Sequence, residues 1–400
     1  MIRFSRIVCI LVLSLFALFS ASAETDDKQA MVDSLVSEAL NLTKYGRFQE
    51  SSGIFNELLN KPGLRFSKDS KKNIYGCMGC NARLDGDYSE YCKYLSLQGY
   101  NKKDADWLFY SALATVPKQS LSRPDSDIQV SYSIDSVYIE NEFRGCLIRL
   151  PVKVGGKEEM MVLDNGCANF SAVSESFATG HGIRPIEAQI KTNGTVGSAE
   201  SKMGVADSIS IGEMVFKNVL FIILPDKSFP SSITDVSAIL GANIFRLAGE
   251  MIFDNADRTL TFPSFQREVD SNVEIDGDGC YSLDVVANND TLKFHLDLGA
   301  ARTHFSSNYF TKNKDVIEST CVVGSKKTGG IGGVKEEKVY YLKDVALYSG
   351  GGSFEMEEIM VSTEAYPAQH TEDGLLGNDF ILSFDKVVLN LRKMFLVVPH

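Results

Sequence analysis

Two aspartates stand at matching places in two similar stretches of the sequence. Residues 161–168 read MVLDNGCA and residues 293–300 read KFHLDLGA, so each apolar run ends in Asp-x-Gly and a small residue. The aspartates are Asp164 and Asp297. Two carboxyl groups held close together share one proton, because like charges do not both form easily, and such a pair can act as general acid and base toward water. The two aspartates are therefore candidates for such a carboxyl pair.

The similarity between the two copies continues beyond the aspartates. A glycine-bearing hairpin follows each one, at residues 194–197 (GTVG) and 329–333 (GGIGG). An apolar-apolar-Gly segment comes next, in residues 239–245 (ILGANIF) and 375–381 (LLGNDFI). A single Asp-x-Gly is weak evidence, since such tripeptides are common in turns, but three motifs in the same order indicate a duplicated unit.

Through these motifs, residues 138–400 resemble the pepsin and retropepsin-like aspartic peptidases, whose two lobes each contain Asp-Thr/Ser-Gly and a later apolar-apolar-Gly segment. The resemblance implies lobes at residues 138–268 and 269–400, with residues 329–333 similar to a retroviral-type flap. It also implies an aspartic endopeptidase that hydrolyses a peptide or protein substrate with an activated water, without a metal or other cofactor.

The resemblance also implies roles for individual residues. Asp164 and Asp297 would be the catalytic dyad, and the glycine two positions after each would allow the tight turn that exposes the carboxylate. The flap hairpins would close over an extended peptide and exclude water. The residues expected to contact substrate are Gly166, Thr195, Val196, Gly197, Gly299, Gly330, Ile331 and Gly332.

The middle residue of each Asp-x-Gly motif departs from the family pattern. Thr or Ser, whose hydroxyl bonds across to the opposite loop, is replaced by Asn165 and Leu298. The amide of Asn165 could still donate a hydrogen bond, whereas Leu298 cannot. If Arg302 faced the carboxyl groups, its charge would lower their pKa values and favour the doubly ionised pair. The alternative function is therefore a catalytically inactive relative that binds peptide or acts as a scaffold.

The elements that carry these motifs have the pattern of β-strands. Short β-branched stretches with period-two alternation, separated by Gly, Asn and Asp, dominate the C-terminal part of the chain. Together with helices before them, they predict an α+β fold that is mainly antiparallel β. The resemblance implies that its β part is a bilobal pepsin- or retropepsin-like double unit. A Ser-, Pro- and Asp-rich stretch predicts a linker over residues 121–137. The predicted strands are residues 146–154, 160–163, 208–211, 219–224, 259–262, 339–342, 387–391 and 395–398.

Residues 24–120 are predicted to form a helical domain, because apolar residues recur there at spacings of three and four. Residues 45–50 (YGRFQE) are echoed by residues 85–90 (DGDYSE), and in each copy the glycine would turn the chain between two helices. This resembles tetratricopeptide-type helical hairpins, which implies a protein partner for this region. The alternative is a plain helical domain that packs on its neighbour.

The first residues have the pattern of a targeting segment. Arg3 and Arg6 precede an apolar stretch that ends near Phe19, and residues 21–23 (ASA) supply small residues for a signal peptidase. Residues 1–23 are therefore predicted to be a signal peptide, and the mature chain is expected to be exported, periplasmic or secreted, with no membrane span. The alternative is an uncleaved anchor, for which the apolar run is short.

Composition and the remaining motifs argue against other function classes. The chain has 40 Lys and Arg against 52 Asp and Glu, a net charge of −12, which disfavours a broad nucleic-acid-binding surface. Cys77 and Cys80 could be a redox pair or half a zinc site, but a local disulfide or two buried thiols is favoured because no second pair follows. Cys167, His295 and His304 are interpreted as structural, since no nucleophile or metal motif surrounds them.

Overall fold

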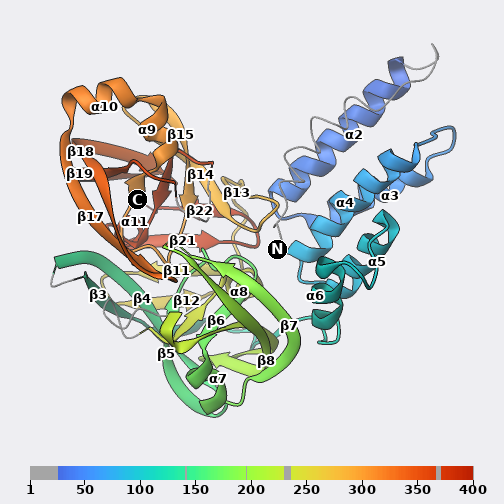
Figure 1. Cartoon of the computed structure of the whole chain (residues 1–400), viewed down its shortest axis with the longest axis horizontal. Coiled ribbons are helices and arrows are strands. Elements are labelled where there is room, and N and C mark those ends of the chain that lie inside the picture. Colours follow the sequence, from blue (N-terminus) through green and yellow to red (C-terminus); the bar gives the residue numbers. More distant parts are fainter. Residues whose placement is uncertain (1–25, 140–141, 195, 229–235, 366–370, 400) are drawn as a thin grey trace. The chain divides into compact units, whose positions relative to one another are not determined.

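The computed structural model describes residues 26–139, 142–194, 196–228, 236–365 and 371–399, which form two compact units (Figure 1). The helical unit contains the described residues up to Lys118 and the segment Ile275–Gly279. The β unit contains Gln119–Glu274 and Cys280–His400. Helices followed by mainly antiparallel sheets confirm the α+β fold class.

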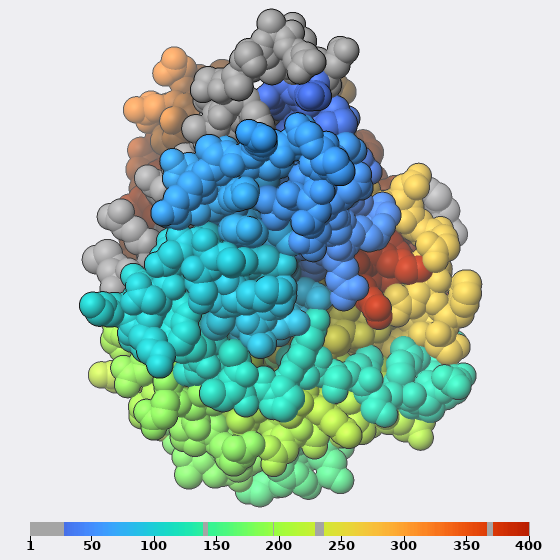
Figure 2. All heavy atoms as spheres, turned by 90° about the vertical axis from the view of Figure 1, so that its right-hand side faces the viewer, coloured from blue at the N-terminus to red at the C-terminus, as the bar shows by residue number. Residues whose placement is uncertain are grey.

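The helical unit is built from helices that pack against their neighbours in the chain. Figure 2 faces this unit, and the atoms of its helices, blue to cyan, form a continuous surface there. A helical N-terminal region is thus confirmed, while the likeness to tetratricopeptide hairpins stays a prediction. The helices are α2 (Asp26–Lys44), α3 (Phe48–Asn60), α4 (Lys68–Leu84), α5 (Tyr88–Gln98) and α6 (Ala105–Leu113).

Two glycine turns explain the repeat seen in the helical sequence. Gly46 lies between α2 and α3 and Gly86 between α4 and α5, with φ of 72° and 71°. The N–H of Arg47 donates to the carbonyl of Leu42 at 2.8 Å, and the same bond at 2.8 Å closes the second turn. This is the Schellman helix end, in which glycine adopts the left-handed conformation without a steric penalty.

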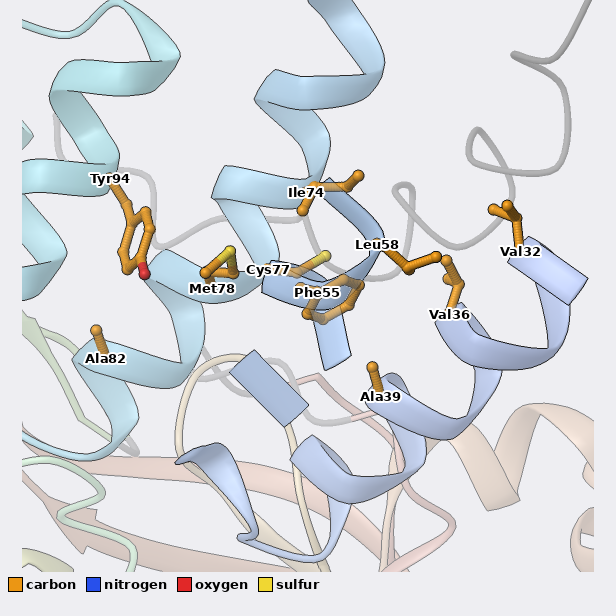
Figure 3. Packing of buried hydrophobic residues seen from close by; sticks show 10 residues of the cluster. All are labelled: Val32, Val36, Ala39, Phe55, Leu58, Ile74, Cys77, Met78, Ala82 and Tyr94. Atoms are coloured by element: carbon orange, nitrogen blue, oxygen red, sulfur yellow. The ribbon is translucent and has the colours of Figure 1, made fainter. Parts of the chain in front are cut away.

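Apolar side chains from α2 to α5 meet in one core (Figure 3). Val32, Val36 and Ala39 lie on one face of α2, as their spacing of four and three requires, and point toward Phe55 and Leu58 of α3. Both α3 side chains have no exposed surface. The cluster is completed by Ile74, Cys77, Met78, Ala82 and Tyr94.

A buried amide adds polar contacts between these helices. The Asn81 side chain of α4 accepts a hydrogen bond from Thr43 Oγ1 of α2 at 2.7 Å and donates to Ser51 Oγ of α3 at 2.9 Å. Because a buried amide that loses its partners costs free energy, this network favours one arrangement of the three helices.

Cys77 and Cys80 are both buried as free thiols in α4. Burial raises the pKa of the Cys77 thiol to about 12 and also raises that of Cys80. The thiolate, which is the reactive and metal-binding form, is therefore disfavoured at neutral pH. Of the two favoured alternatives, a local disulfide and buried thiols, the structure has buried thiols.

The first lobe of the β unit is one sheet with the strand order β1-β9-β6-β10-β5-β4-β8-β7, and β3 pairs with β4. Within it, β10 runs parallel to β5 and antiparallel to β6, and β6 runs parallel to β9. The elements are β1 (Ser120–Ser122), β3 (Ser133–Ile139), β4 (Glu142–Val154), β5 (Lys157–Leu163), β6 (Ser171–Ser174), α7 (Glu175–Gly180), β7 (Arg184–Asn193), β8 (Ser198–Ile211), β9 (Met214–Leu224), a 3-10 turn (Asp226–Ser228), β10 (Ala238–Leu240) and α8 (Ala242–Ala248).

The second lobe repeats these pairings in a sheet of order β13-β14-β15-β20-β16-β19-β18-β17. Here β20 runs parallel to β15 and antiparallel to β16, and β16 runs parallel to β19. The matching topology confirms that the unit is duplicated. The elements are β13 (Val273–Ile275), β14 (Tyr281–Ala287), β15 (Asp290–Leu296), β16 (His304–Phe305), α9 (Ser307–Lys312), α10 (Lys314–Thr320), β17 (Val322–Gly330), β18 (Gly333–Ser349), β19 (Gly352–Ser362), β20 (Gly374–Leu376) and α11 (Asn378–Leu382).

A third sheet, of order β2-β12-β11-β21-β22, joins the two lobes. Its strands are β2 (Ile128–Ser131), β11 (Glu250–Asp254), β12 (Thr259–Phe262), β21 (Lys386–Asn390) and β22 (Phe395–Val397). β11 of the first lobe pairs antiparallel with β21 of the second, with Ile252 opposite Val388. The strand pair that ends each copy therefore fixes one lobe against the other.

Most predicted strands lie within observed ones, but the flap strands are much longer than predicted. β18 covers Gly333–Ser349, whereas the sequence pattern indicated only residues 339–342. The outer part of this hairpin is rich in Gly, Lys and Glu and has no apolar alternation to reveal it. Part of the segment predicted as a linker, residues 121–137, forms strands, since β1 pairs with β9 and β2 with β12.

In the part of the chain that the structure describes, no helix is both long enough and apolar enough to cross a membrane. The predicted signal peptide, residues 1–23, lies outside the described residues.

The helical core gives a stability prediction. Replacing Phe55 by Ala removes a side chain with no exposed surface and should lower the free energy of unfolding of the helical unit by about 3–5 kcal/mol. Leu97→Ala, at a position that is 45% exposed, is the control and should change it by at most about 0.5 kcal/mol. Denaturant titration followed by helical circular dichroism measures both, and equal losses would contradict the proposed core.

Candidate active site

Each aspartate follows directly on a buried strand of its lobe. β5 ends one residue before Asp164 and β15 one residue before Asp297. The N–H of Asp164 donates to Leu240 of β10, and the N–H of Asp297 donates to Leu376 of β20, each at 3.0 Å. The apolar-apolar-Gly segments therefore hold the two aspartates in equivalent positions, which is the reason both motifs recur in the sequence.

The structure brings the two Asp-x-Gly loops together. A Cβ placed on Gly166 would lie 2.6 Å from Oδ1 of Asp297, and one on Gly299 would lie 2.7 Å from Oδ2 of Asp164. Real Cβ atoms do not approach a carboxylate this closely, so neither position admits any side chain. Each carboxyl group packs against the glycine of the opposite loop, so the structure brings these four residues together.

The two carboxyl groups influence each other electrostatically. Part of the Asp164 side chain reaches solvent, yet protein atoms surround its carboxyl group. Burial and the negative charge of Asp297 raise the pKa of Asp164 to about 8, while the N–H groups of Cys167 and Gly166 oppose the shift. A hydrogen bond to Asp297 favours the protonated form. At neutral pH this geometry favours one proton held between the two carboxyl groups.

Backbone donors fix the orientation of both carboxylates. The N–H of Cys167 donates to Asp164 Oδ1 at 3.0 Å, and the N–H of Gly299 donates to Asp297 Oδ1 at 2.8 Å. Each of these two oxygens accepts a hydrogen bond from the backbone of its own loop. The loop conformation itself therefore positions the carboxyl groups.

Asn165 makes the contact between the two loops. Its Nδ2 donates to the carbonyl of Leu296 at 2.7 Å, and its Oδ1 accepts from the N–H of Leu298 at 2.7 Å. The expectation that its amide donates across is confirmed, and the same amide also accepts. Leu298 opposite has no exposed surface and contributes packing in place of a hydroxyl. One side chain thus makes both of these hydrogen bonds between the loops.

The segment after Leu376 supports the second loop with residues that the sequence analysis did not single out. Asn378 Nδ2 donates to the carbonyl of Leu298 at 2.6 Å. Asp379 accepts from the N–H of Thr303 at 2.8 Å and from its hydroxyl at 2.6 Å. These residues stand directly after the apolar-apolar-Gly motif, so their position was the available signal.

The two flap hairpins, β7–β8 and β17–β18, meet at their tips. The N–H of Gly197 donates to the carbonyl of Ile331 at 3.0 Å. A Cβ on Gly332, whose φ is 103°, would lie 2.6 Å from the backbone nitrogen of Gly197, and a Cβ on Gly194 would overlap Ile331. Glycine is required at these positions because the two backbones are in direct contact.

The other predicted flap residues lie at the same tips, with one exception. Val196 precedes Gly197 in the first tip, and Gly330 pairs with Gly333 in the second. Thr195 lies outside the described residues.

Other chemistry-bearing residues near the aspartates have structural surroundings. Burial and the charges of Asp164 and Asp297 raise the pKa of the Cys167 thiol far above its ordinary value, which disfavours a nucleophilic thiolate. His295 is buried and its Nδ1 lies 2.9 Å from the carbonyl oxygen of Tyr281. Among the described residues, no group of three or more His, Cys, Asp or Glu side chains could hold a metal ion.

Arg302 is directed toward the hairpin β3–β4. Its guanidinium centre lies 5.5 Å from the ring centroid of Phe143 and its charge acts on Asp379 and Lys326. The main influences on Asp164 are burial and Asp297. The structure thus gives no support to the expectation that Arg302 holds the dyad doubly ionised.

Comparisons with known proteins point in the same direction as the geometry. Residues 150–244 match the family of aspartyl proteases. This segment of the first lobe is therefore similar to aspartic proteases.

Two solved structures are similar to this chain at low sequence identity. Conglutin gamma, a basic 7S globulin from lupine seeds, is 11% identical, with a TM-score of 0.40 over 68% of this chain and 94% of its own. A retropepsin-like aspartic protease from Rickettsia conorii is 12% identical, with a TM-score of 0.22 over 36% of this chain and 90% of its own. No curated protein matches the chain.

The double role of Asn165 can be tested by its effect on stability. In Asn165→Leu, the Leu296 carbonyl and the Leu298 N–H lose their buried partner. Each loss should lower the free energy of unfolding by about 1–3 kcal/mol. Asn165→Thr should lose less, because a hydroxyl can both donate and accept. Denaturant titration of the β unit measures both losses. A Leu variant as stable as the Thr variant would contradict the bridging role.

The raised pKa of Asp164 predicts how stability depends on pH. Between its ordinary value of 3.8 and about 8, the folded state keeps a proton that the unfolded chain releases, so the free energy of unfolding falls as pH rises. Asp164→Asn removes this dependence, and its stability relative to wild type should increase from pH 4 to pH 8. Asp207→Asn, at an exposed site, is the control and should show a constant difference across this range.

Proposed function

We propose that the chain is an exported aspartic endopeptidase that hydrolyses peptide bonds with Asp164, Asp297 and an activated water. The observation that carries the proposal is the mutual packing of the two Asp-x-Gly loops, in which each carboxyl group lies against the glycine of the other loop. The match of residues 150–244 to aspartyl proteases supports the same reaction class.

The chemistry follows from one proton shared between two carboxyl groups. The ionised member takes a proton from the bound water, which then attacks the scissile carbonyl carbon. The protonated member donates a hydrogen bond to the carbonyl oxygen and stabilises the negative charge that develops there. As the tetrahedral intermediate collapses, a carboxyl proton passes to the leaving amine. Asp164, with its raised pKa, is suited to begin as the protonated member.

The flap hairpins would bind the substrate backbone. An extended peptide can hydrogen-bond to a strand-like surface, and the Gly-rich tips around Gly197 and Gly332 leave the flap N–H and C=O groups accessible at close range. Because the tips contact each other, substrate would enter when they separate and be enclosed when they meet again.

Export and a protein partner complete the proposal. The predicted signal peptide at residues 1–23 is the basis for a periplasmic or secreted location. The helical unit would contribute a protein-binding surface, since helical hairpin arrays commonly expose one.

A specific observation favours a second function, that of an inactive peptide-binding protein. The second lobe lacks the hydroxyl that would form a hydrogen bond across to the first loop, because the buried side chain of Leu298 takes its place. If one amide, that of Asn165, held the carboxyl groups too loosely for chemistry, the flaps and loops would still bind a peptide. A positional error of about 1 Å is enough to cost on the order of 100-fold in rate.

Mutating the dyad tests the proposed function. Asp164→Asn and Asp297→Asn should each abolish cleavage of unfolded protein substrates between pH 3 and pH 8, because neither variant can share a proton between two carboxyl groups. Peptide release measured by mass spectrometry is the readout, with thermal melting to verify folding and chelator added to verify independence from metal ions.

Asp207→Asn is the matched control, because Asp207 is an exposed aspartate on β8 of the same lobe, paired with Arg184. Its cleavage rate should equal that of wild type. Cleavage that survives either dyad substitution would refute the proposed mechanism. A folded wild type that cleaves nothing would refute the peptidase and favour the peptide-binding function.

A further inference from the structure

The two lobes differ in one hairpin that lies close to the second flap. In the first lobe, β3 is seven residues long and pairs along the outer part of β4, whereas β13, next to β14 in the second lobe, is three residues long. β3 packs against β17 of the second flap hairpin. The hairpin β3–β4 is therefore an addition to the duplicated scaffold that reaches across to the other lobe.

This hairpin presents aromatic side chains to solvent. Tyr138 is 49% exposed and Phe143 is 47% exposed, and their ring centroids are 5.8 Å apart in an edge-on arrangement. Exposed aromatic pairs on an otherwise well-packed sheet are typical of binding surfaces.

Arg302 is an exposed cation placed against the same hairpin. Its guanidinium centre lies 5.5 Å from the ring centroid of Phe143, in the geometry of a cation–π contact. β4 approaches the segment that carries Arg302 so closely that a Cβ on Gly145 would lie 2.9 Å from Arg302 Cγ. The ring and the backbone orient the guanidinium while leaving the side chain exposed to solvent.

Lys326 of β17 adds a second, less exposed cation. It stands directly opposite Glu337 in the flap hairpin, and Glu337 is buried and accepts a hydrogen bond from Ser362 Oγ at 3.0 Å. Burial lowers the pKa of the Lys326 ammonium to about 8; Glu337 opposes this shift, and the positive charges of Arg144 and Arg302 add to it. Arg144 and Arg302 thus lie near enough to Lys326 to repel its ammonium group.

The acidic groups near these cations are already engaged. Asp379 accepts hydrogen bonds from both the N–H and the hydroxyl of Thr303, and Glu337 accepts a hydrogen bond from the hydroxyl of Ser362. The positive charges of Arg144 and Arg302 both act on Lys326, so an additional carboxylate placed beside Arg302 and Lys326 would be attracted. It would bind best where the cations are partly removed from water, since charge-assisted hydrogen bonds are stronger there.

We propose that Arg302, Lys326 and the exposed rings of Tyr138 and Phe143 form a subsite that binds a carboxylate of the substrate. The carboxylate comes either from an Asp or Glu side chain or from the C-terminus of the peptide. The subsite rests on the proposed function, because its ligand is the peptide held between the flaps and the dyad.

The position of Arg302 in the chain limits its distance from Asp297. Arg302 is five residues after Asp297, and five extended residues span at most about 17 Å. An extended peptide advances about 3.4 Å per residue, so a side chain a few positions from the scissile bond can reach the guanidinium. The asymmetric hairpin places the subsite on one side of the dyad, so the preference should fall at one position or two adjacent positions of the peptide.

Peptide binding to the Asp164→Asn variant tests the subsite without requiring catalysis. The probes are decapeptide pools with amidated C-termini that carry Glu or Gln at one fixed position and random uncharged residues elsewhere. Competition against a fluorescein-labelled pool, read by anisotropy, gives the dissociation constants. At the preferred position the Glu pool should bind about tenfold more tightly than the Gln pool. A pool without Glu but with a free C-terminal carboxylate distinguishes the two sources.

Arg302→Gln and Lys326→Gln, each added to Asp164→Asn, should bring the Glu-to-Gln ratio toward one. Arg184→Gln is the matched control, because Arg184 is an exposed arginine of the first lobe, and it should keep the full ratio. Arg302→Gln alters an exposed side chain, so the test remains valid even if Lys326→Gln fails to fold.

Equal binding of all pools, no binding of any pool, or a ratio that persists in Arg302→Gln would overturn the subsite. Cleavage by wild type without a carboxylate preference would overturn the subsite alone. Carboxylate-dependent binding by a chain that cleaves nothing would refute the peptidase and leave the subsite standing.

Discussion

The close approach of two loops is the constraint on which the β unit depends. Gly166 touches the carboxyl group of Asp297, Gly299 touches that of Asp164, and no side chain fits at either position. Such contact requires the lobes to be held in one arrangement, which the pairing of β11 with β21 provides. It also requires each loop to leave its strand at the same place, which is ensured by the hydrogen bonds from the aspartate N–H groups to the carbonyls of Leu240 and Leu376. The parts of the duplicated sequence that match best are those that make this contact possible.

Holding two carboxyl groups so close has an electrostatic cost that the surrounding structure must offset. Backbone N–H groups of Cys167 and Gly299 donate to the carboxylates, and one shared proton removes the repulsion between two full charges. Asn165 then ties the loops with one donor and one acceptor. A symmetric pair of hydroxyls is unnecessary for this purpose, because one amide carries both functions and the opposite position can be filled by an apolar side chain.

The sequence was sufficient for the features that depend on local pattern or on the repeat. The two aspartates, their glycines and the helical turns at Gly46 and Gly86 all follow from motif and spacing. The sequence was insufficient to predict the features that depend on tertiary contacts. The outer flap strands lack apolar alternation, so only pairing with their partners makes β18 as long as it is. The two-way bond of Asn165 and the charge environment of Lys326 depend on residues more than ten positions away in the chain, which no local pattern reveals.

The differences between the lobes can be related to the direction of a bound peptide chain. A peptide has a direction, whereas a perfectly duplicated site presents the same surface to either direction. Asn165 faces Leu298, and the long hairpin β3–β4 has only the short β13 as its counterpart, so the two sides of the dyad present different groups. Unequal surroundings also give the two carboxyl groups different tendencies to hold the shared proton, as the raised pKa of Asp164 illustrates. In the proposed mechanism one carboxyl group begins protonated and the other ionised, so departures from symmetry would allow one substrate orientation and one proton position to be favoured together.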